Sequence, residues 1–303
     1  MNFRDLEYII ALAETRSFSK ASEKCFVSQP ALSMQVKKLE DVLDAKLFER
    51  HQKTVLITPL GLEIVEKAKQ ALQLRRDIEL LAQHSHNLTS FQVRMGIFPT
   101  MSQYLLPSII QSSLRCENPK LNIIPVEQKT VRLKAMIKQG DLDFAILAKP
   151  NQIDPMMAFD PLFEDPFMLA VYEGHPLASK ASVTLQDLAN ENMLLLEEGH
   201  CLREQILALQ IDKKLVVEDQ ITSVETLRQM VIARLGVTVM PYIATQGIKY
   251  KGIHYIPFKG HKLYRTIGLY YRMSAPLVAN IAPIKQLIRD AYPHSTLNDQ
   301  DLT

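Results

Sequence analysis

The longest run without a helix-breaking residue separates two parts of the chain that differ in sequence pattern. After Gly61, neither glycine nor proline occurs before Asn87, and Thr58-Pro59 supplies an N-cap followed by a first-turn proline. We therefore predict one helix from Leu60 to about Asn87, roughly 28 residues and about 40 Å long. Most helices of globular domains are shorter, so this length favours a coiled-coil-like linker that pairs two copies of the chain. The alternative is a helix buried in a core.

Three shorter helices and a hairpin are predicted before this linker. Apolar residues from Leu6 onward recur at helical spacing in the first helix. The second helix lies within Ser17–Cys25, with Ser19 as its expected cap, and the third begins after Ser28. The two runs of residues 48–53 and 54–57 fit the strands of a wing.

The third helix has one apolar face and one polar, mildly basic face. The residues expected to pack inward are Leu32, Val36, Leu39 and Leu43. This layout is that of a helix-turn-helix, whose recognition helix enters the major groove of DNA. The residues expected to contact DNA are Gln29, Pro30, Ser33, Lys37 and Lys38 on this helix, with Arg50 and Lys53 on the wing. The alternative is a solvated helix face on an ordinary three-helix module.

Beyond the linker, strands alternate with helices. The strands expected first are Gln92–Phe98, Leu121–Val126 and Leu142–Leu147, and the helices between them are Leu105–Arg115 and Val131–Gln139. The alternation continues, with a strand over Phe167–Tyr172, to a helix from Pro276 to about Tyr292. Such a pattern predicts an α/β fold with parallel sheets and ligand sites at the carboxyl ends of strands.

Cys201 lies where such a site is expected. Met193–Leu196 reads as a short buried strand, a polar turn follows, and a helix runs from Leu202. This places Cys201 in the first turn of a helix, where unpaired N–H groups and the helix dipole stabilise a thiolate. His200 and Arg203 flank it. The alternative is an inert cysteine that packs as a small apolar residue.

Composition limits the classes of protein that fit. A chain of 303 residues is long enough for two or three domains. Three well-separated cysteines, at positions 25, 116 and 201, argue for a reducing compartment, and no signal peptide or membrane-spanning run is apparent. We therefore expect a cytoplasmic protein that is not bound to a membrane. No phosphate-binding glycine motif, zinc-ligand cluster or nucleophile elbow occurs, so neither an enzyme nor a cofactor or metal site is expected.

The first ninety residues resemble the LysR family of bacterial transcription regulators. The motifs that carry the resemblance are Val27-Ser28-Gln29-Pro30-Ala31-Leu32-Ser33, Lys38-Leu39-Glu40, Leu47-Phe48-Glu49-Arg50 and Leu56-Ile57-Thr58-Pro59-Leu60-Gly61. The resemblance implies a winged helix-turn-helix DNA-binding domain over residues 1–58 and a linker or dimerisation helix over 59–88. It also implies an effector domain over 89–303 like a periplasmic binding protein. In that domain, subdomain I would hold residues 89–163 and 268–303, and subdomain II residues 164–267.

The remainder resembles the peroxide-sensing branch of that family. The segments that match are Pro99-Thr100, Leu195-Leu196-Glu197-Glu198-Gly199-His200-Cys201-Leu202-Arg203, Thr222-Ser223-Val224-Glu225-Thr226-Leu227-Arg228 and Arg265-Thr266-Ile267-Gly268-Leu269. This likeness implies that Cys201 is oxidised by hydrogen peroxide. It places Thr100, Thr130, His200 and Glu204 in the surrounding pocket, with Glu204 in place of the usual aspartate. It further implies a homodimer joined by the linker helix, a homotetramer on an interrupted palindrome of double-stranded DNA, and contact with RNA polymerase to activate transcription.

The chain departs from that branch at its second cysteine. The resolving cysteine of the branch falls on Gln210 here. One hypothesis is that Cys201 signals as a sulfenic acid, a mixed disulfide or an intersubunit disulfide. A second is that redox switching is lost and the chain responds to a small metabolite, with Cys201 structural. A third class, a solute-binding protein or enzyme with the effector fold, is disfavoured by the N-terminal helix-turn-helix.

Overall fold

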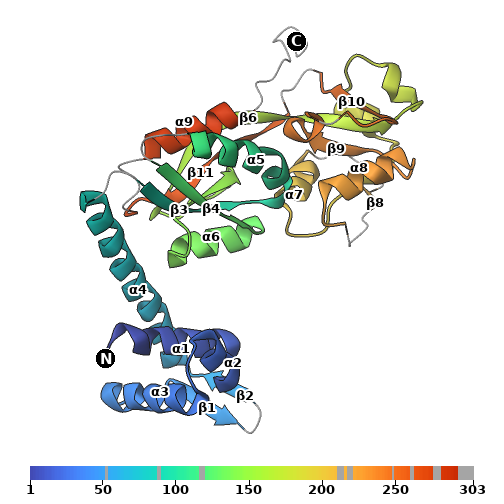
Figure 1. Cartoon of the computed structure of the whole chain (residues 1–303). Coiled ribbons are helices and arrows are strands. Elements are labelled where there is room, and N and C mark those ends of the chain that lie inside the picture. The colour runs from blue at the N-terminus through green and yellow to red at the C-terminus, as the bar shows by residue number, and fades with distance from the viewer. Residues whose placement is uncertain are drawn as a thin grey trace. The chain divides into compact units, whose positions relative to one another are not determined.

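A computed structural model describes residues 1–51, 54–86, 90–115, 120–209, 215–216, 221–247, 249–259, 263–275 and 281–292. The chain divides into two compact units, Met1–His86 and Asn87–Thr303 (Figure 1). Among the described residues, no helix is long and apolar enough to cross a membrane.

The N-terminal unit is a winged helix-turn-helix followed by a long helix. Its elements are α1 (Phe3–Thr15), α2 (Phe18–Lys24), α3 (Gln29–Leu43), β1 (Phe48–His51), β2 (Thr54–Ile57) and α4 (Pro59–His86). The prediction that Ser19 caps α2 was wrong: Ser17 is the cap, and its side chain accepts a hydrogen bond from the Lys20 N–H. Ser28 caps α3 as predicted, by accepting from the Ala31 N–H.

The apolar face of α3 forms the centre of this unit. Leu32, Val36 and Leu39 are buried, with Leu43 packed against the same cluster, as the spacing predicted. Glu40 is also buried, because its Oε1 accepts hydrogen bonds from the N–H groups of Leu47 (2.8 Å) and Phe48 (3.1 Å). This carboxylate ties the recognition helix to the first strand of the wing.

Helix α4 has the predicted length of 28 residues. Thr58 caps it by accepting from the Gly61 N–H at 2.9 Å. Val65 and Ala68 pack into the N-terminal core, whereas Leu62, Leu74 and Ile78 are exposed. Helix α4 is therefore only partly buried in this core, and several of its apolar side chains are exposed.

The C-terminal unit is built on a seven-stranded mixed sheet. Its helices of more than one turn are α5 (Pro99–Arg115), α6 (Thr130–Gln139), α7 (Cys201–Ala208), α8 (Val224–Ile232) and α9 (Ile281–Ala291). Its strands are β3 (Ser90–Ile97), β4 (Lys120–Glu127), β5 (Phe144–Ala148), β6 (Met157–Tyr172), β7 (Met193–Leu194), β8 (Leu215–Val216), β9 (Thr238–Pro241), β10 (Ile253–Pro257) and β11 (Tyr264–Arg272). Helices α5 and α9 lie on one side of β3 and β11, and α6 lies on the other (Figure 1).

The prediction of parallel sheets holds for only part of this unit. Strand β3 pairs in parallel with β4 and β5, and β7 with β8. Strand β6 pairs antiparallel with β9, β10 and β11, and β11 also pairs antiparallel with β5. The reason is that β6 is one continuous strand of 16 residues, of which the sequence pattern predicted only Phe167–Tyr172.

Two apolar cores lie along β6, and β11 contributes to the first of them. The first contains residues of β3, β5, α5, α6 and α9, and the second contains residues of β7, α7, α8, β9 and β10. Strand β6 therefore links two halves, which we call the first half and the second half, and β11 pairs with β6 up to their junction. The pairing of β6 with β11 shifts register between Ile267 and Gly268, where a Cβ on Gly268 would lie 2.4 Å from the Asp160 carbonyl oxygen. Only glycine fits this approach of the two strands.

Candidate functional site

A buried arginine joins β6 and β11 to the start of α5. Arg265 donates from Nη1 to the Thr100 Oγ1 (2.9 Å) and from Nη2 to the Thr100 carbonyl oxygen (3.3 Å). It also pairs with Asp165, with 2.9 Å between Nη2 and Oδ2, and both side chains are almost fully buried. Helix α5 begins at Pro99, earlier than the predicted Leu105, so Thr100 lies in its first turn. Thr100 is held by this arginine, and its hydroxyl proton can still be donated to a ligand.

Both carboxylate oxygens of Asp165 accept hydrogen bonds. Its Oδ1 accepts from the Ile243 N–H (3.0 Å) and from the Tyr292 hydroxyl (3.1 Å). Burial and the nearby Asp165 carboxylate raise the pKa of Tyr292 above its usual range. The network therefore holds one buried positive and one buried negative charge, with a neutral phenol beside them.

Cys201 lies between the two cores. It is the first residue of α7, as the sequence predicted, and His200 is the N-cap. Leu202 and Ile206 of the same helix are buried in the second core, whereas Cys201 packs against residues of the first. The sulfur is therefore placed where the two halves of the unit meet.

The thiol of Cys201 favours its neutral form. The residue is half-buried, but burial of the thiol is the largest effect and raises its pKa. Arg265, the Thr130 hydroxyl and the Leu202 N–H act in the opposite direction, and the Glu204 carboxylate raises the pKa further. The Leu202 N–H stabilises the thiolate as the helix start predicts, but desolvation outweighs this and the other favourable groups, so the pKa of the thiol is raised overall.

Thr130 contributes a hydroxyl that no regular hydrogen bond satisfies. It is the first residue of α6, and Lys129 is the N-cap position, so the threonine does not cap the helix. Its Oγ1 is buried without a partner of regular hydrogen-bond geometry, although it lies close enough to Cys201 to lower the pKa of the thiol. An unsatisfied buried hydroxyl beside a thiol can bind a small polar ligand.

His200 lies beside the ion pair of Lys129 and Glu197. Its Nε2 is buried, lies 3.6 Å from the Glu197 Oε1 and has no regular hydrogen bond. Burial and the charge of Lys129 lower the pKa of His200, and Glu197 opposes this. The Lys129 Nζ lies 2.5 Å from Glu197 Oε1, and this hydrogen bond lowers the pKa of the carboxyl group. His200 is therefore expected to be neutral near pH 7.

A cavity of about 410 Å³ opens beside these residues. Its lining includes Thr100, Lys129, Glu197 and His200, together with Pro99, Ser102, Gln103, Glu127, Thr222, Ser223 and Val224. The predicted pocket residues are therefore only partly brought together. Thr100 and His200 face the cavity, but Cys201 and Thr130 lie beside it. Glu204 is exposed, and it does not line the cavity.

Sequence reasoning missed three residues of this network. Arg265 falls in a matched segment that assigns it no role, and Asp165 and Lys129 fall in none of the motifs. No local pattern distinguishes them, because each finds its partner across 68 to 165 residues of chain. Among the described residues, no group of three His, Cys, Asp or Glu side chains is placed to hold a metal ion.

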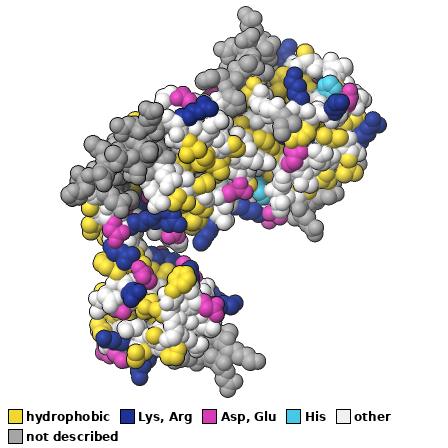
Figure 2. Space-filling model, in the orientation of Figure 1, with side chains coloured by type: hydrophobic (Ala, Val, Ile, Leu, Met, Phe, Trp, Pro, Cys, Tyr) yellow, Lys and Arg dark blue, Asp and Glu magenta, His cyan; other side chains and the backbone are white. Residues whose placement is uncertain are grey.

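The predicted DNA-contacting residues of α3 lie mostly at its surface. Gln29, Pro30, Lys37 and Lys38 are exposed, and Ser33 is half-buried. Lys53 and the side chain of Arg50 lie outside the described residues. Basic and acidic side chains are interspersed on the visible face of this unit (Figure 2).

Family comparisons identify the class of protein. The family described as "Bacterial regulatory helix-turn-helix protein, lysR family" matches residues 3–62, and the "LysR substrate binding domain" matches residues 86–293. The chain belongs to the LysR family of DNA-binding transcription regulators, and it is not an enzyme.

Within that family, the chain is similar to regulators named OxyR. The Escherichia coli (strain K12) "DNA-binding transcriptional dual regulator OxyR" is 40% identical over 293 residues, 95% of each chain. A "Hydrogen peroxide-inducible genes activator" of Haemophilus influenzae is 38% identical over 281 residues, 91% of this chain and 92% of the relative. A full-length OxyR variant of Pseudomonas aeruginosa has a TM-score of 0.76 at 35% identity, over 95% of this chain and 98% of that structure. These relatives confirm the resemblance to the peroxide-sensing branch.

Proposed function

We propose that this regulator activates transcription in response to hydrogen peroxide, with Cys201 as the residue that is oxidised. The observation that supports this most directly is the position of the thiol between the two cores. It lies beside the Thr130 hydroxyl, which has no regular hydrogen bond, and the charge of Arg265 acts to lower its pKa. The names of the relatives point to the same effector.

The chemistry requires a thiolate and hydrogen-bond donors for the peroxide. The Cys201 thiolate attacks one oxygen of HOOH, the O–O bond breaks, and the products are Cys201 sulfenic acid and hydroxide. The sulfur is oxidised by two electrons and the peroxide is reduced. Thr130 can donate to the peroxide, and Arg265 stabilises the thiolate by its charge.

The product beyond the sulfenic acid depends on a second thiol. Gln210, at the position of the usual resolving cysteine, and Cys116 lie outside the described residues. We propose that the signalling form is the sulfenic acid itself, a mixed disulfide or an intersubunit disulfide, because each needs no second cysteine near Cys201 in the same chain.

The assembly that we propose follows the family's arrangement. Residues 1–58 would bind DNA, 59–88 would pair two chains, and 89–303 would form the effector domain, with subdomain boundaries at 163/164 and 267/268. Exposed Leu74 and Ile78 on α4 support the pairing. A homotetramer would then bind an interrupted palindrome in the cytoplasm and contact RNA polymerase.

The cavity favours a second candidate function. Because Thr100 and His200 line it and Cys201 does not, a small metabolite could bind there without involving the sulfur. The regulator would then be ligand-responsive, with Cys201 structural.

DNA binding by the full chain separates the two proposals. Footprints of wild type and Cys201→Ser are compared with and without peroxide, on an operator selected by the wild-type chain. A peroxide-dependent change in wild type that is absent in Cys201→Ser supports peroxide sensing. An identical footprint under all four conditions contradicts it and favours the metabolite regulator.

A further inference from the structure

Lys129 contacts several consecutive residues of the loop that carries Cys201. We call Glu197–His200, which precede α7, the cysteine loop. The Lys129 Nζ lies 2.5 Å from Glu197 Oε1 and donates to the Glu198 carbonyl oxygen at 3.1 Å. Gly199, at φ +85°, faces the lysine stem: a Cβ on it would lie 3.4 Å from the Lys129 Cδ. The charge of Lys129 also reaches His200.

The two partners belong to different halves of the C-terminal unit. Lys129 directly precedes α6, whose Leu133 and Ile137 are buried in the first core. The cysteine loop follows Leu195 and Leu196, which are buried in the second core. Lys129 therefore bridges the halves at one end of the loop, while its neighbour Thr130 lies beside Cys201 at the other end.

The geometry points to Lys129 as a positioning residue: we propose that it holds the cysteine loop against α6 and so limits access of thiols and disulfides to the Cys201 sulfur. Hydrogen peroxide is much smaller than a thiol or disulfide reagent, so its access should depend less on the position of the loop. A thiol that condenses with the sulfenic acid must approach the sulfur itself, to form Cys201–S–S–R and release water. This second step rests on the proposed function, whereas the access barrier does not.

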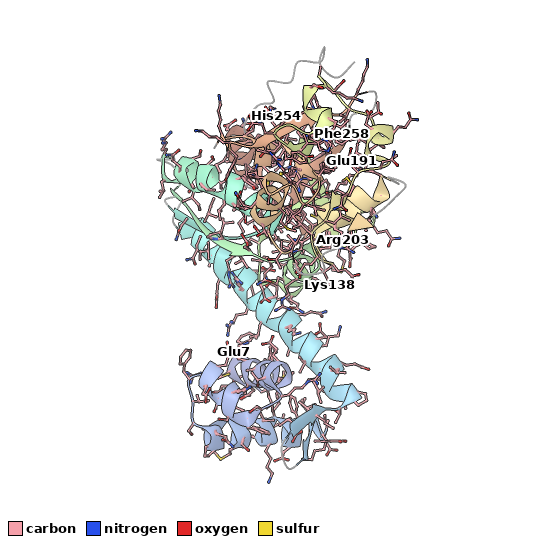
Figure 3. All side chains as sticks on the ribbon, turned by 90° about the vertical axis from the view of Figure 1, so that its right-hand side faces the viewer. Glu7, Lys138, Glu191, Arg203, His254 and Phe258 are labelled. Carbon is pink, nitrogen blue, oxygen red and sulfur yellow. The ribbon has the colours of Figure 1, made fainter. Side chains whose placement is uncertain are left out.

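A bulky disulfide reagent measures that barrier in the reduced protein. The full chain reacts with 5,5′-dithiobis(2-nitrobenzoate), and peptide mass spectrometry follows the Cys201 and Cys25 peptides over time. The test variant is Lys129→Met, which keeps the stem and removes the charge. The matched control is Lys138→Met in α6, whose lysine is labelled in Figure 3. This lysine pairs with Asp154 at 3.4 Å and is 70% exposed.

We expect Lys129→Met to speed modification of Cys201 about five-fold, the scale of a partly exposed ion pair. Lys129→Arg should restore the wild-type rate, and Lys138→Met should match wild type. Raising the salt concentration should speed wild type but not Lys129→Met, because salt screens the pair.

An unchanged Cys201 rate in Lys129→Met, or an equal increase in Lys138→Met, would overturn the proposal. The Cys25 peptide reports general unfolding, so a parallel rise at both cysteines would also count against it. If Lys129→Met does not fold, Glu197→Gln removes the other partner and carries the same expectation. Because the assay uses reduced protein without peroxide, its result tests the role of Lys129 even if the protein does not sense peroxide.

Discussion

Arg265 on β11 faces Asp165 on β6 as a direct cross-strand pair, and the two form a buried ion pair. The guanidinium Nε and Nη2 lie 3.0 and 2.9 Å from the same carboxylate oxygen. The remaining donors of Arg265 extend to Thr100 at the start of α5. One ion pair thus fixes β11 against β6, the strand that links the two halves, and places a positive charge near Cys201.

Replacing Asp165 by Asn should strongly destabilise the protein. The change leaves a buried guanidinium without its counter-charge, which typically costs about 3–5 kcal/mol. Urea unfolding of the full chain, followed by circular dichroism, measures the loss for the C-terminal transition. Lys138→Ala, which breaks an exposed pair, should cost less than about 1 kcal/mol. Equal losses in the two variants would show that the buried pair has no special role.

Substitutions of Thr130 and Thr100 should affect different properties. The first should change the rate of Cys201 oxidation, and the second should change the stability of the fold. Thr130→Val removes a hydroxyl without a regular partner, so stability should change by less than about 1 kcal/mol. Oxidation of Cys201 by peroxide should slow about ten-fold, because the variant loses a group that lowers the thiol pKa and can bind peroxide. Thr100→Val should lower the free energy of unfolding by about 1–3 kcal/mol, since it leaves the buried Arg265 Nη1 without its acceptor. Rapid-quench mass spectrometry measures the oxidation rate, and urea unfolding measures the stability. An unchanged oxidation rate in Thr130→Val would show that its hydroxyl takes no part in the reaction.

The oxidation rate should rise with pH through neutrality. Burial raises the pKa of Cys201, so the thiol is mostly protonated at pH 7. Below the pKa, the thiolate fraction increases about ten-fold per pH unit, and the rate of peroxide attack should follow it from pH 7 to 8. A rate that is already constant above pH 6 would indicate a low pKa and contradict the structure's electrostatics.

Lys37 on α3 should contribute to DNA affinity without sequence preference. Lys37→Ala is expected to weaken binding to all sequences and to reduce the slope of log K against log salt by about one. Fluorescence anisotropy at several salt concentrations measures the slope. Lys138→Ala, in the C-terminal unit, serves as the charge-matched control and should leave it unchanged.

The parts of the fold that depend on local signals could be predicted from sequence. The Ser28 cap, the buried face of α3, the length of α4 and the place of Cys201 at the start of α7 each follow from a few neighbouring residues. Such features need no knowledge of distant contacts.

The remaining features depend on pairing between distant segments. The first part of β6 contains Pro161 and Pro166 and reads as irregular, but pairing with β11 makes it a strand. The raised pKa of Cys201 has the same origin, since the first core that buries the thiol comes from other segments. Helix position alone predicted the opposite shift.

The most direct test of the account is the chemical state of Cys201 after mild peroxide treatment. Full-length protein is exposed to a near-stoichiometric amount of hydrogen peroxide, trapped with dimedone and analysed by peptide mass spectrometry, while DNA footprints are recorded on the same samples. If Cys201 is the sensor, a sulfenic acid or disulfide appears on Cys201 in step with the change in footprint. A footprint that changes while the Cys201 peptide stays unmodified would contradict it.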